Sequence, residues 1–154
     1  MYPAILILHS LLRWVVLGLG LWAVLRGLTG VLGPRPWTPA DDRAGRWFTI
    51  VIDVQTLVGL LLYGVLSPIT RTALTDMGAA MASRSLRFWA VEHLAMMLVA
   101  VALVHVGRAR ARKARFDEGK HKRATIFYAL ALAAMLVAIP WPWMTDGRPW
   151  FRLG

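Results

Sequence analysis

The chain has 154 residues, of which 58% are hydrophobic and 17% are charged, whereas soluble domains carry about a quarter charged residues. This composition excludes a soluble catalytic domain, because four membrane spans of about 20 residues each leave little besides connections. The chain has no cysteine, which also excludes disulfides, iron–sulfur clusters, thiolate metal sites and covalent c-type haem attachment.

The net charge of +10 does not indicate nucleic-acid binding. Eight of the 18 Lys and Arg residues lie in one short stretch between apolar segments, where the sidedness of membrane insertion accounts for them. We therefore expect the lipid membrane, and no nucleic acid, as the environment of the chain.

Four apolar segments predict an all-α, integral membrane four-helix bundle that forms a single domain over residues 1–154. The expected spans are approximately residues 3–28, 47–66, 86–106 and 124–139. The first segment lacks a basic n-region and a small-residue cleavage site, so we expect a retained span and not a signal peptide.

The connections are expected to be short. Prolines and paired aspartates in residues 33–46 predict a loop that cannot continue a helix. After the second span, Thr75 and Asp76 are expected to cap a short surface helix over residues 77–82. Residues 108–123 carry the densest charge in the chain and are expected to form a basic loop.

The distribution of Lys and Arg predicts the orientation. Twelve of them lie in the first and third connections or at the adjoining span ends, and five lie on the opposite face. The positive-inside rule therefore predicts an N-out and C-out multi-pass protein with both termini outside and the basic loop in the cytoplasm. If the source is bacterial, the membrane is expected to be the inner membrane and the termini to lie in the periplasm.

Two histidines are predicted to lie at one depth. His9 and His93 each lie about six or seven residues into a span that runs inward, so both are expected roughly 10 Å below the outer hydrocarbon edge. Two histidines on two parallel helices at one level are typical of a b-type haem held between helices, with imidazole on both faces of the iron. The alternative is that each histidine only hydrogen-bonds a neighbouring helix.

The helical neighbours of these histidines are compatible with a porphyrin. Trp89 and Met97 lie on the His93 face, and Arg13 lies on the His9 face. Gly20 and Ala100 follow on the same two faces and are expected to leave room for a flat cofactor. A second haem would require His105 and His121 to pair from a span end and a loop, so the pattern favours one haem.

Arg13, Asp53 and Glu92 are the clear membrane-embedded charges. Each carboxylate is expected about 6 Å along the axis from Arg13, so an ion pair of Arg13 with Glu92 or Asp53 is the most economical prediction. The functional alternatives are that Arg13 neutralises a haem propionate, or that Glu92 relays protons to a quinone.

Three motifs resemble a family of small bacterial four-helix membrane proteins labelled cytochrome B-like. They are residues 9–14 (HSLLRW), residues 87–93 (RFWAVEH) followed by Met96 and Met97, and residues 139–143 (IPWPW). The resemblance covers nearly the whole chain and implies a haem or quinone redox protein of the membrane. More loosely, the chain is similar to four-helix b-type cytochromes and to the haem-bearing anchors of respiratory dehydrogenases.

The expected function is therefore that of a membrane electron-transfer protein or subunit that holds one haem b between His9 and His93 and exchanges electrons with a quinol pool. An alternative of a different class is a cofactor-free accessory subunit of a larger respiratory or photosynthetic complex. A transporter using Asp53 and Glu92 is less compatible with four uninterrupted spans. No catalytic residues are predicted, and a subunit partnered by other membrane proteins is favoured over a stand-alone enzyme.

Overall fold

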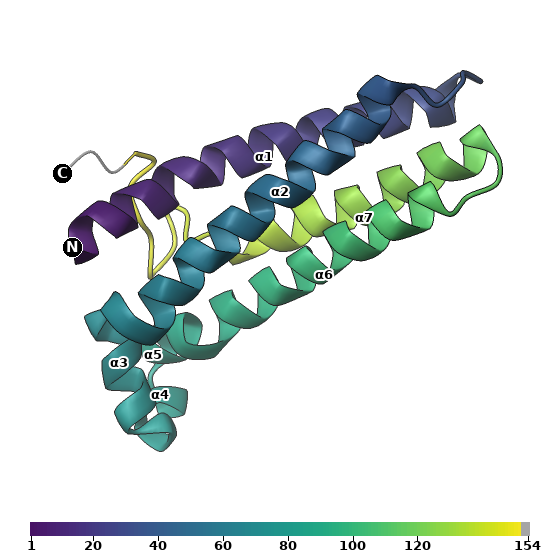
Figure 1. Ribbon diagram of the computed structural model, residues 1–154. Coiled ribbons are helices and arrows are strands. Elements are labelled where there is room, and N and C mark those ends of the chain that lie inside the picture. The colour runs from purple at the N-terminus through teal and green to yellow at the C-terminus, as the bar shows by residue number, and fades with distance from the viewer. Residues whose placement is uncertain (152–154) are drawn as a thin grey trace.

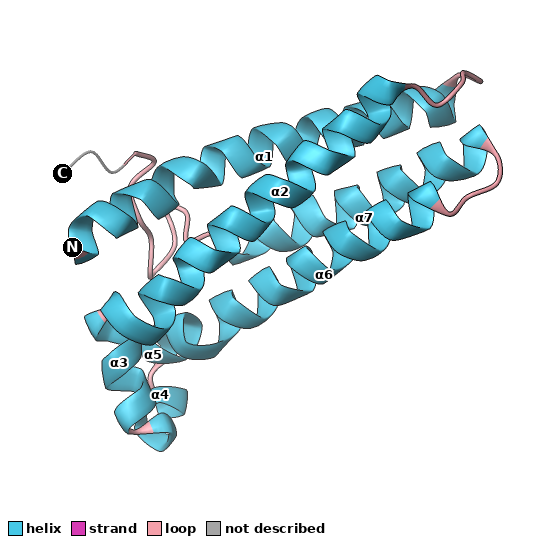
Figure 2. Ribbon diagram, in the orientation of Figure 1, coloured by secondary structure: helices cyan, strands magenta, loops and turns pink. Residues whose placement is uncertain are grey.

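Four long antiparallel helices form the protein (Figure 1), seen in a computed structural model that describes residues 1–151. They are α1 (Tyr2–Leu32), α2 (Pro39–Leu61) with the π-helical turn η1 (Leu62–Leu66), the π-helical turn η2 (Phe88–Glu92) with α6 (His93–Arg112), and α7 (Asp117–Ala138). Three short helices, α3 (Pro68–Thr75), α4 (Met77–Ala82) and α5 (Arg84–Arg87), connect η1 to η2 (Figure 2).

Each of the four long helices is long and apolar enough to cross a membrane. The predicted all-α membrane bundle is thereby confirmed, and the chain is a multi-pass membrane protein. Both the N-terminus and the C-terminal segment lie at one end of the bundle (Figure 1). We call this the terminal end, and we call the opposite end, where the α1–α2 and α6–α7 connections lie, the basic end.

The helices extend further at the basic end than the sequence predicts. The expected loop over residues 33–46 is wrong in its second half, because α2 begins at Pro39. The backbone N–H of Thr38 donates to the Asp41 carboxylate at 2.8 Å, so this aspartate starts a helix instead of interrupting one. Similarly, α6 continues to Arg112 and α7 begins at Asp117, which shortens the basic loop.

The predicted surface helix is confirmed as α4, and Asp76 Oδ1 accepts the backbone N–H of Ala79 at 2.9 Å. The neighbouring helices α3 and α5 were not predicted. Ser67 and Ser83 cap them, but their few turns lack an apolar pattern long enough to recognise in the sequence.

The bundle is a ring in which α1 and α6 each pack on both α2 and α7. Helices α1 and α6 therefore face each other diagonally. Much of the buried core consists of alanine, which allows close approach of membrane helices. Helix α1 packs tightly on α7, where the ring of His121 lies directly on Gly30 and leaves no room for a Cβ atom.

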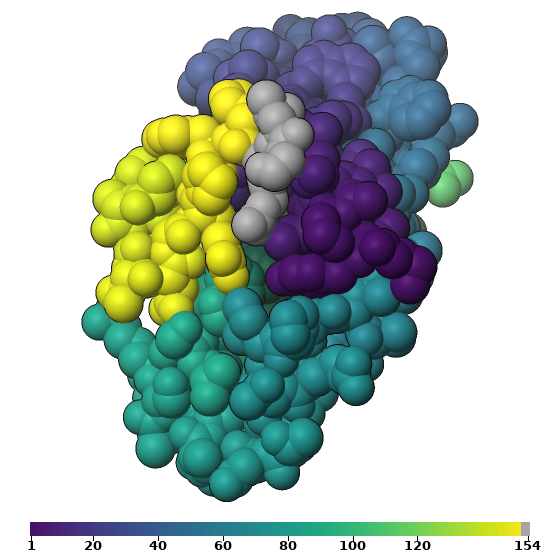
Figure 3. Space-filling view, turned by 90° about the vertical axis from the view of Figure 1, so that its left-hand side faces the viewer, coloured from purple at the N-terminus to yellow at the C-terminus, as the bar shows by residue number. Residues whose placement is uncertain are grey.

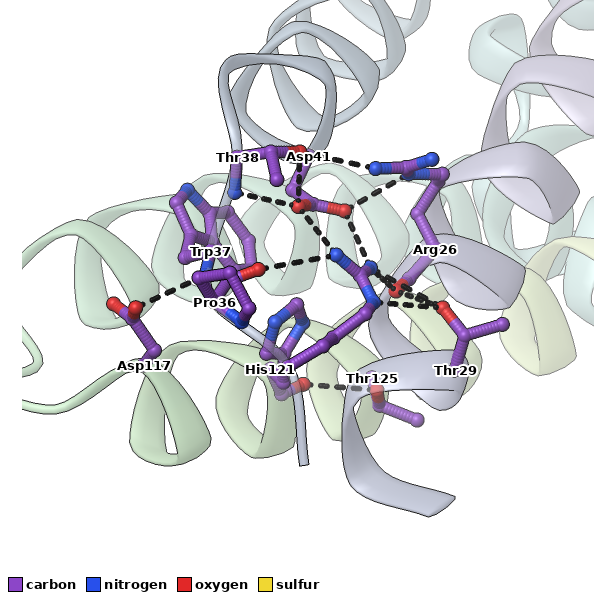
Figure 4. A network of polar contacts seen from close by, with 10 residues as sticks. Arg26, Thr29, Pro36, Trp37, Thr38, Asp41, Asp117, His121 and Thr125 are labelled. Atoms are coloured by element: carbon purple, nitrogen blue, oxygen red, sulfur yellow. Dashed lines mark hydrogen bonds and ion pairs between the residues drawn. The ribbon is translucent and has the colours of Figure 1, made fainter. Parts of the chain in front are cut away.

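A buried carboxylate organises the basic end (Figure 4). The Asp41 side chain is 1% exposed and accepts Nε of Arg26 at 2.9 Å and Nη2 of Arg35 at 2.7 Å. Hydrogen bonding to Asp41 raises the pKa of the Arg35 guanidinium, which stays charged. The next loop residue, Trp37, donates its backbone N–H to Asp117 at 3.0 Å, so this network joins α1, α2 and α7.

Candidate functional site

A cavity of about 170 Å³ lies inside the half of the bundle nearer the terminal end. Residues from α1, α2, α6 and the C-terminal segment line it, and its walls are mainly apolar. Figure 3 shows the surface hollowed between the start of α1 in purple, the C-terminal segment in yellow and the teal region of the short helices. An apolar cavity with a few convergent polar groups is the usual form of a small-molecule site.

All five residues predicted to contact a cofactor line this one cavity. They are His9, Arg13, Trp89, His93 and Met97. His9 and Arg13 come from α1, and the other three come from η2 and α6, the helix diagonally opposite. The structure therefore brings the predicted set together across the interior of the bundle.

The ring of His93 is oriented by a backbone carbonyl. Its Nδ1 lies 2.8 Å from the carbonyl oxygen of Ala138, at the end of α7. A carbonyl can only accept, so Nδ1 carries the proton and, in the neutral ring, Nε2 keeps its lone pair. Histidines that bind metals are commonly oriented in this way, with the second nitrogen bonded to a carbonyl or carboxylate.

His9 is less completely satisfied. Gln55 Nε2 donates to the His9 carbonyl at 3.0 Å and lies 3.4 Å from Nε2 of the ring, which is at the weak end of the hydrogen-bond range. The other ring nitrogen, Nδ1, is buried without a hydrogen-bond partner among the described residues. An unpaired buried polar atom is costly unless a ligand or water satisfies it.

Two π-helical turns border the cavity. Trp89 belongs to η2 and Tyr63 belongs to η1, and both line the cavity. The Tyr63 hydroxyl donates to the carbonyl oxygen of Ala90 at 2.9 Å, which links the two turns directly. Such turns within long helices occur frequently at functional sites, and here η2 immediately precedes His93.

The predicted ion pair of Arg13 with Glu92 or Asp53 is wrong. Glu92 instead binds Arg87 at 2.7 Å, and Asp53 binds His105 at 2.8 Å. The prediction rested on depth along the axis, and depth does not fix the direction in which a side chain leaves its helix.

Arg13 instead turns toward the C-terminal segment. Its Nη2 donates to the carbonyl oxygen of Trp150 at 2.8 Å, and its Nε is buried without a hydrogen-bond partner in the described part of the chain. The guanidinium of Arg148 lies 4.8 Å from the centre of the Trp89 ring, and it lines the same cavity. Among the described residues that line the cavity there is no Asp or Glu.

The expectation that Gly20 and Ala100 leave room for a flat cofactor is also wrong. Phe48 and Leu132 fill the space beside Gly20, where an added Cβ would lie 2.8 and 2.7 Å from them. Ala100 is part of the buried core. Both residues serve helix packing, which was the alternative interpretation of small residues.

The other two histidines do not pair with each other. His105 binds Asp53, and His121 is fully buried against Trp37, with 4.9 Å between the ring centres. A second bis-histidine site is therefore contradicted, and His9 and His93 are the two histidines of the cavity.

Gln55, Tyr63 and Arg148 are among the polar residues that line the cavity and were not part of the predicted site. A polar amide within an apolar span was a usable signal for Gln55. Nothing in the sequence indicates Arg148, because it reaches the cavity only through the path of the C-terminal segment.

The fold and the cavity define a class: an all-α, multi-pass membrane protein with a polar site between its helices. Comparisons with protein-family models, with curated proteins and with solved structures give no match. The family resemblance of the three motifs therefore stays a prediction, and the function is argued from the cavity.

Proposed function

We propose that the protein is a cytochrome b-like membrane electron-transfer protein or subunit that holds one haem b between His9 and His93. The observation that carries the proposal is the His93 Nδ1 contact with the Ala138 carbonyl, which leaves Nε2 free to bind a metal. When bound, the haem would supply one-electron redox chemistry, and the protein would supply ligands, orientation and a low-dielectric shell.

The remaining cavity residues fit this group in part. His9 offers the second imidazole, provided that Gln55 gives up its 3.4 Å contact with Nε2. Trp89 and Met97 supply apolar walls. Arg13 and Arg148 supply positive charge, which the carboxylates of a haem would neutralise in a cavity whose described lining has no acid.

The cavity volume limits how a porphyrin would lie. An engineered protein cavity of about 150 Å³ accepts a single benzene ring, and this cavity measures about 170 Å³. A macrocycle would therefore have to extend through the opening toward the surface, or α1 and α6 would have to separate.

The same volume favours a quinone head group as a second candidate ligand. One six-membered ring fits the cavity, and the guanidinium of Arg13 presents donors to its carbonyl oxygens. Photolabelling with an azido-quinone should then modify cavity residues such as Met97, and unlabelled quinone should suppress the modification. Labelling confined to the lipid-facing surface would contradict this candidate.

The haem proposal is tested by a dithionite-reduced minus air-oxidised absorption spectrum of the protein purified with its native lipids. We expect a Soret band and a sharp α-band in the wild type, lost or strongly shifted in His9→Ala and His93→Ala. The matched control is His105→Ala, which removes a histidine that lies outside the cavity and should leave the spectrum unchanged.

A wild-type spectrum without haem bands would contradict the proposal, and so would bands that neither cavity histidine affects. Co-purification of a haem-free chain with a larger complex would then favour the accessory-subunit alternative. That alternative has one observation in its favour, the exposed Asp53 and His105 side chains in the membrane-spanning region.

A further inference from the structure

An ion pair lies on the outward face of α2 and α6, away from the haem candidate site. His105 Nε2 and Asp53 Oδ1 are 2.8 Å apart, and the two side chains are 50% and 44% exposed. In Figure 1, α2 and α6 lie at the front of the bundle, so this face is turned to the viewer. The pair belongs to neighbouring helices and bridges the groove between them.

The depth of the pair makes its exposure unusual. Asp53 lies seven residues beyond Arg46, the last charged residue at the basic end of α2, which corresponds to about 10 Å along the helix. The exposed neighbours on α2 are apolar, Ile50 at 42% and Leu57 at 67%. The nearest cation on α6, Arg108, turns away and donates to the Asp42 carbonyl at 3.1 Å.

Lipid does not complete the hydrogen bonding of this pair. Among the described residues, Oδ2 of Asp53 and Nδ1 of His105 have no hydrogen-bond partner. Acyl chains offer neither donors nor acceptors, so ionisable groups in membrane helices usually face protein or a water-filled cavity. The exposed half of the pair therefore indicates a protein partner that covers this face.

We propose that the partner is a second copy of this chain, packed on the α2–α6 face about a two-fold axis along the membrane normal. The charges are self-complementary, because each copy offers one free carboxylate oxygen and one free imidazole nitrogen. Both groups lie at one depth, so such an axis brings the two pairs to the same level. Nδ1–H of His105 in each copy then donates to Oδ2 of Asp53 in the other.

The surface of α6 around His105 permits the approach that this dimer needs. Ala95, Ala102 and Ala109 are exposed and recur every seven residues, one of them a turn before His105 and one a turn after it. A repeat of seven places them along one side of the helix. Small side chains at this spacing allow a second helix to approach closely enough for the polar groups to meet.

The absence of cysteine gives a clean crosslinking test in the full chain reconstituted in lipid vesicles. Ala102→Cys lies next to the proposed axis and should form an intermolecular disulfide on mild oxidation. Ile126→Cys, exposed on the outer face of α7, is the matched control and should stay monomeric under the same conditions. Crosslinking that is equal at both positions, or absent at Ala102→Cys, would overturn the proposal.

The polar contribution is measured by the dimerisation constant in bilayers, for example by single-molecule photobleaching at several protein-to-lipid ratios. Asp53→Asn and His105→Ala should each weaken the dimer roughly three- to twentyfold, the range of interhelical hydrogen bonds in membranes. Exchange of the two residues, Asp53→His with His105→Asp, should restore it, since the swapped pair is also self-complementary.

If both single variants weaken the dimer and the exchanged double variant does not restore it, then Asp53 and His105 of one copy do not contact Asp53 and His105 of the other. A wild type that is monomeric at every protein-to-lipid ratio would likewise contradict the proposal. So would the finding that a different membrane protein, and not a second copy of the chain, covers the α2–α6 face. The haem spectrum is independent of these outcomes, because neither Asp53 nor His105 lines the cavity.

Discussion

At the scale of one residue, Arg13 was correctly predicted to line the candidate site, but its predicted ion-pair partners were wrong. Its charge inside an apolar span indicated a partner, and the two embedded carboxylates were the available choices. In the structure both carboxylates are engaged elsewhere, and Arg13 donates to the neutral carbonyl of Trp150. A half-buried guanidinium with a neutral partner is able to bind an anionic group of a ligand.

Arg13→Gln should therefore weaken haem binding and leave the binding of haem dimethyl ester unchanged, since only the free acid carries the anionic groups. A hydrogen bond to a charged group contributes about 1.5–3 kcal/mol, so we expect a loss of roughly tenfold to a hundredfold for haem. Absorbance titration of the apoprotein measures both affinities.

Arg87→Gln is the control for this titration, because Arg87 binds Glu92 outside the cavity. Equal loss of haem and of its dimethyl ester in Arg13→Gln would show that Arg13 acts on the fold of the site and not on the ligand's carboxylates.

At the scale of elements, the connection between α1 and α2 illustrates how a few polar residues fix two helices. Asp41 joins Arg26 of α1 to Arg35 of the loop, and it also caps the first turn of α2 (Figure 4). The sequence predicted a break at this place but not the network, because the prolines are visible in the sequence and the convergence of two arginines on one carboxylate is not.

Asp41→Ala should destabilise the bundle by roughly 3 kcal/mol, the lower part of the range for breaking a buried ion pair, because both arginines are partly exposed. Asp42→Ala is the matched control on the same helical turn. Asp42 is 30% exposed and its ion-pair contacts are longer, 3.3 and 3.4 Å, so its loss should cost about 1 kcal/mol or less.

Unfolding in mixed detergent micelles, followed by the loss of helical circular dichroism, measures both free energies. Equal destabilisation by the two substitutions would contradict the role given to the Asp41 network.

At the scale of the whole molecule, hydropathy was sufficient to predict the number of spans and their order, because each apolar run is long and is bounded by charge or proline. His9 and His93 were predicted to lie near each other because both helices run in the same direction, and both line one cavity. The rotation of each helix about its own axis was not predictable from the sequence. For this reason the prediction missed the partners of Asp53 and Glu92, and it missed the side chains that fill the space beside Gly20.

The C-terminal segment was equally beyond sequence reasoning. It folds back to the start of α1, where Trp14 donates Nε1–H to the Trp150 carbonyl at 3.0 Å, and it carries Arg148 into the cavity. The Trp150 ring stacks on the Trp14 ring, with 5.9 Å between the ring centres.

The central claim is that His9 and His93 together ligate one haem iron, and low-temperature electron paramagnetic resonance of the oxidised protein tests it most directly. The account predicts a low-spin ferric signal in the wild type, because two imidazoles ligate the iron. It predicts a high-spin signal in His9→Ala and in His93→Ala, and an unchanged low-spin signal in His105→Ala. A high-spin wild type, or a low-spin signal that survives the loss of either cavity histidine, would contradict it.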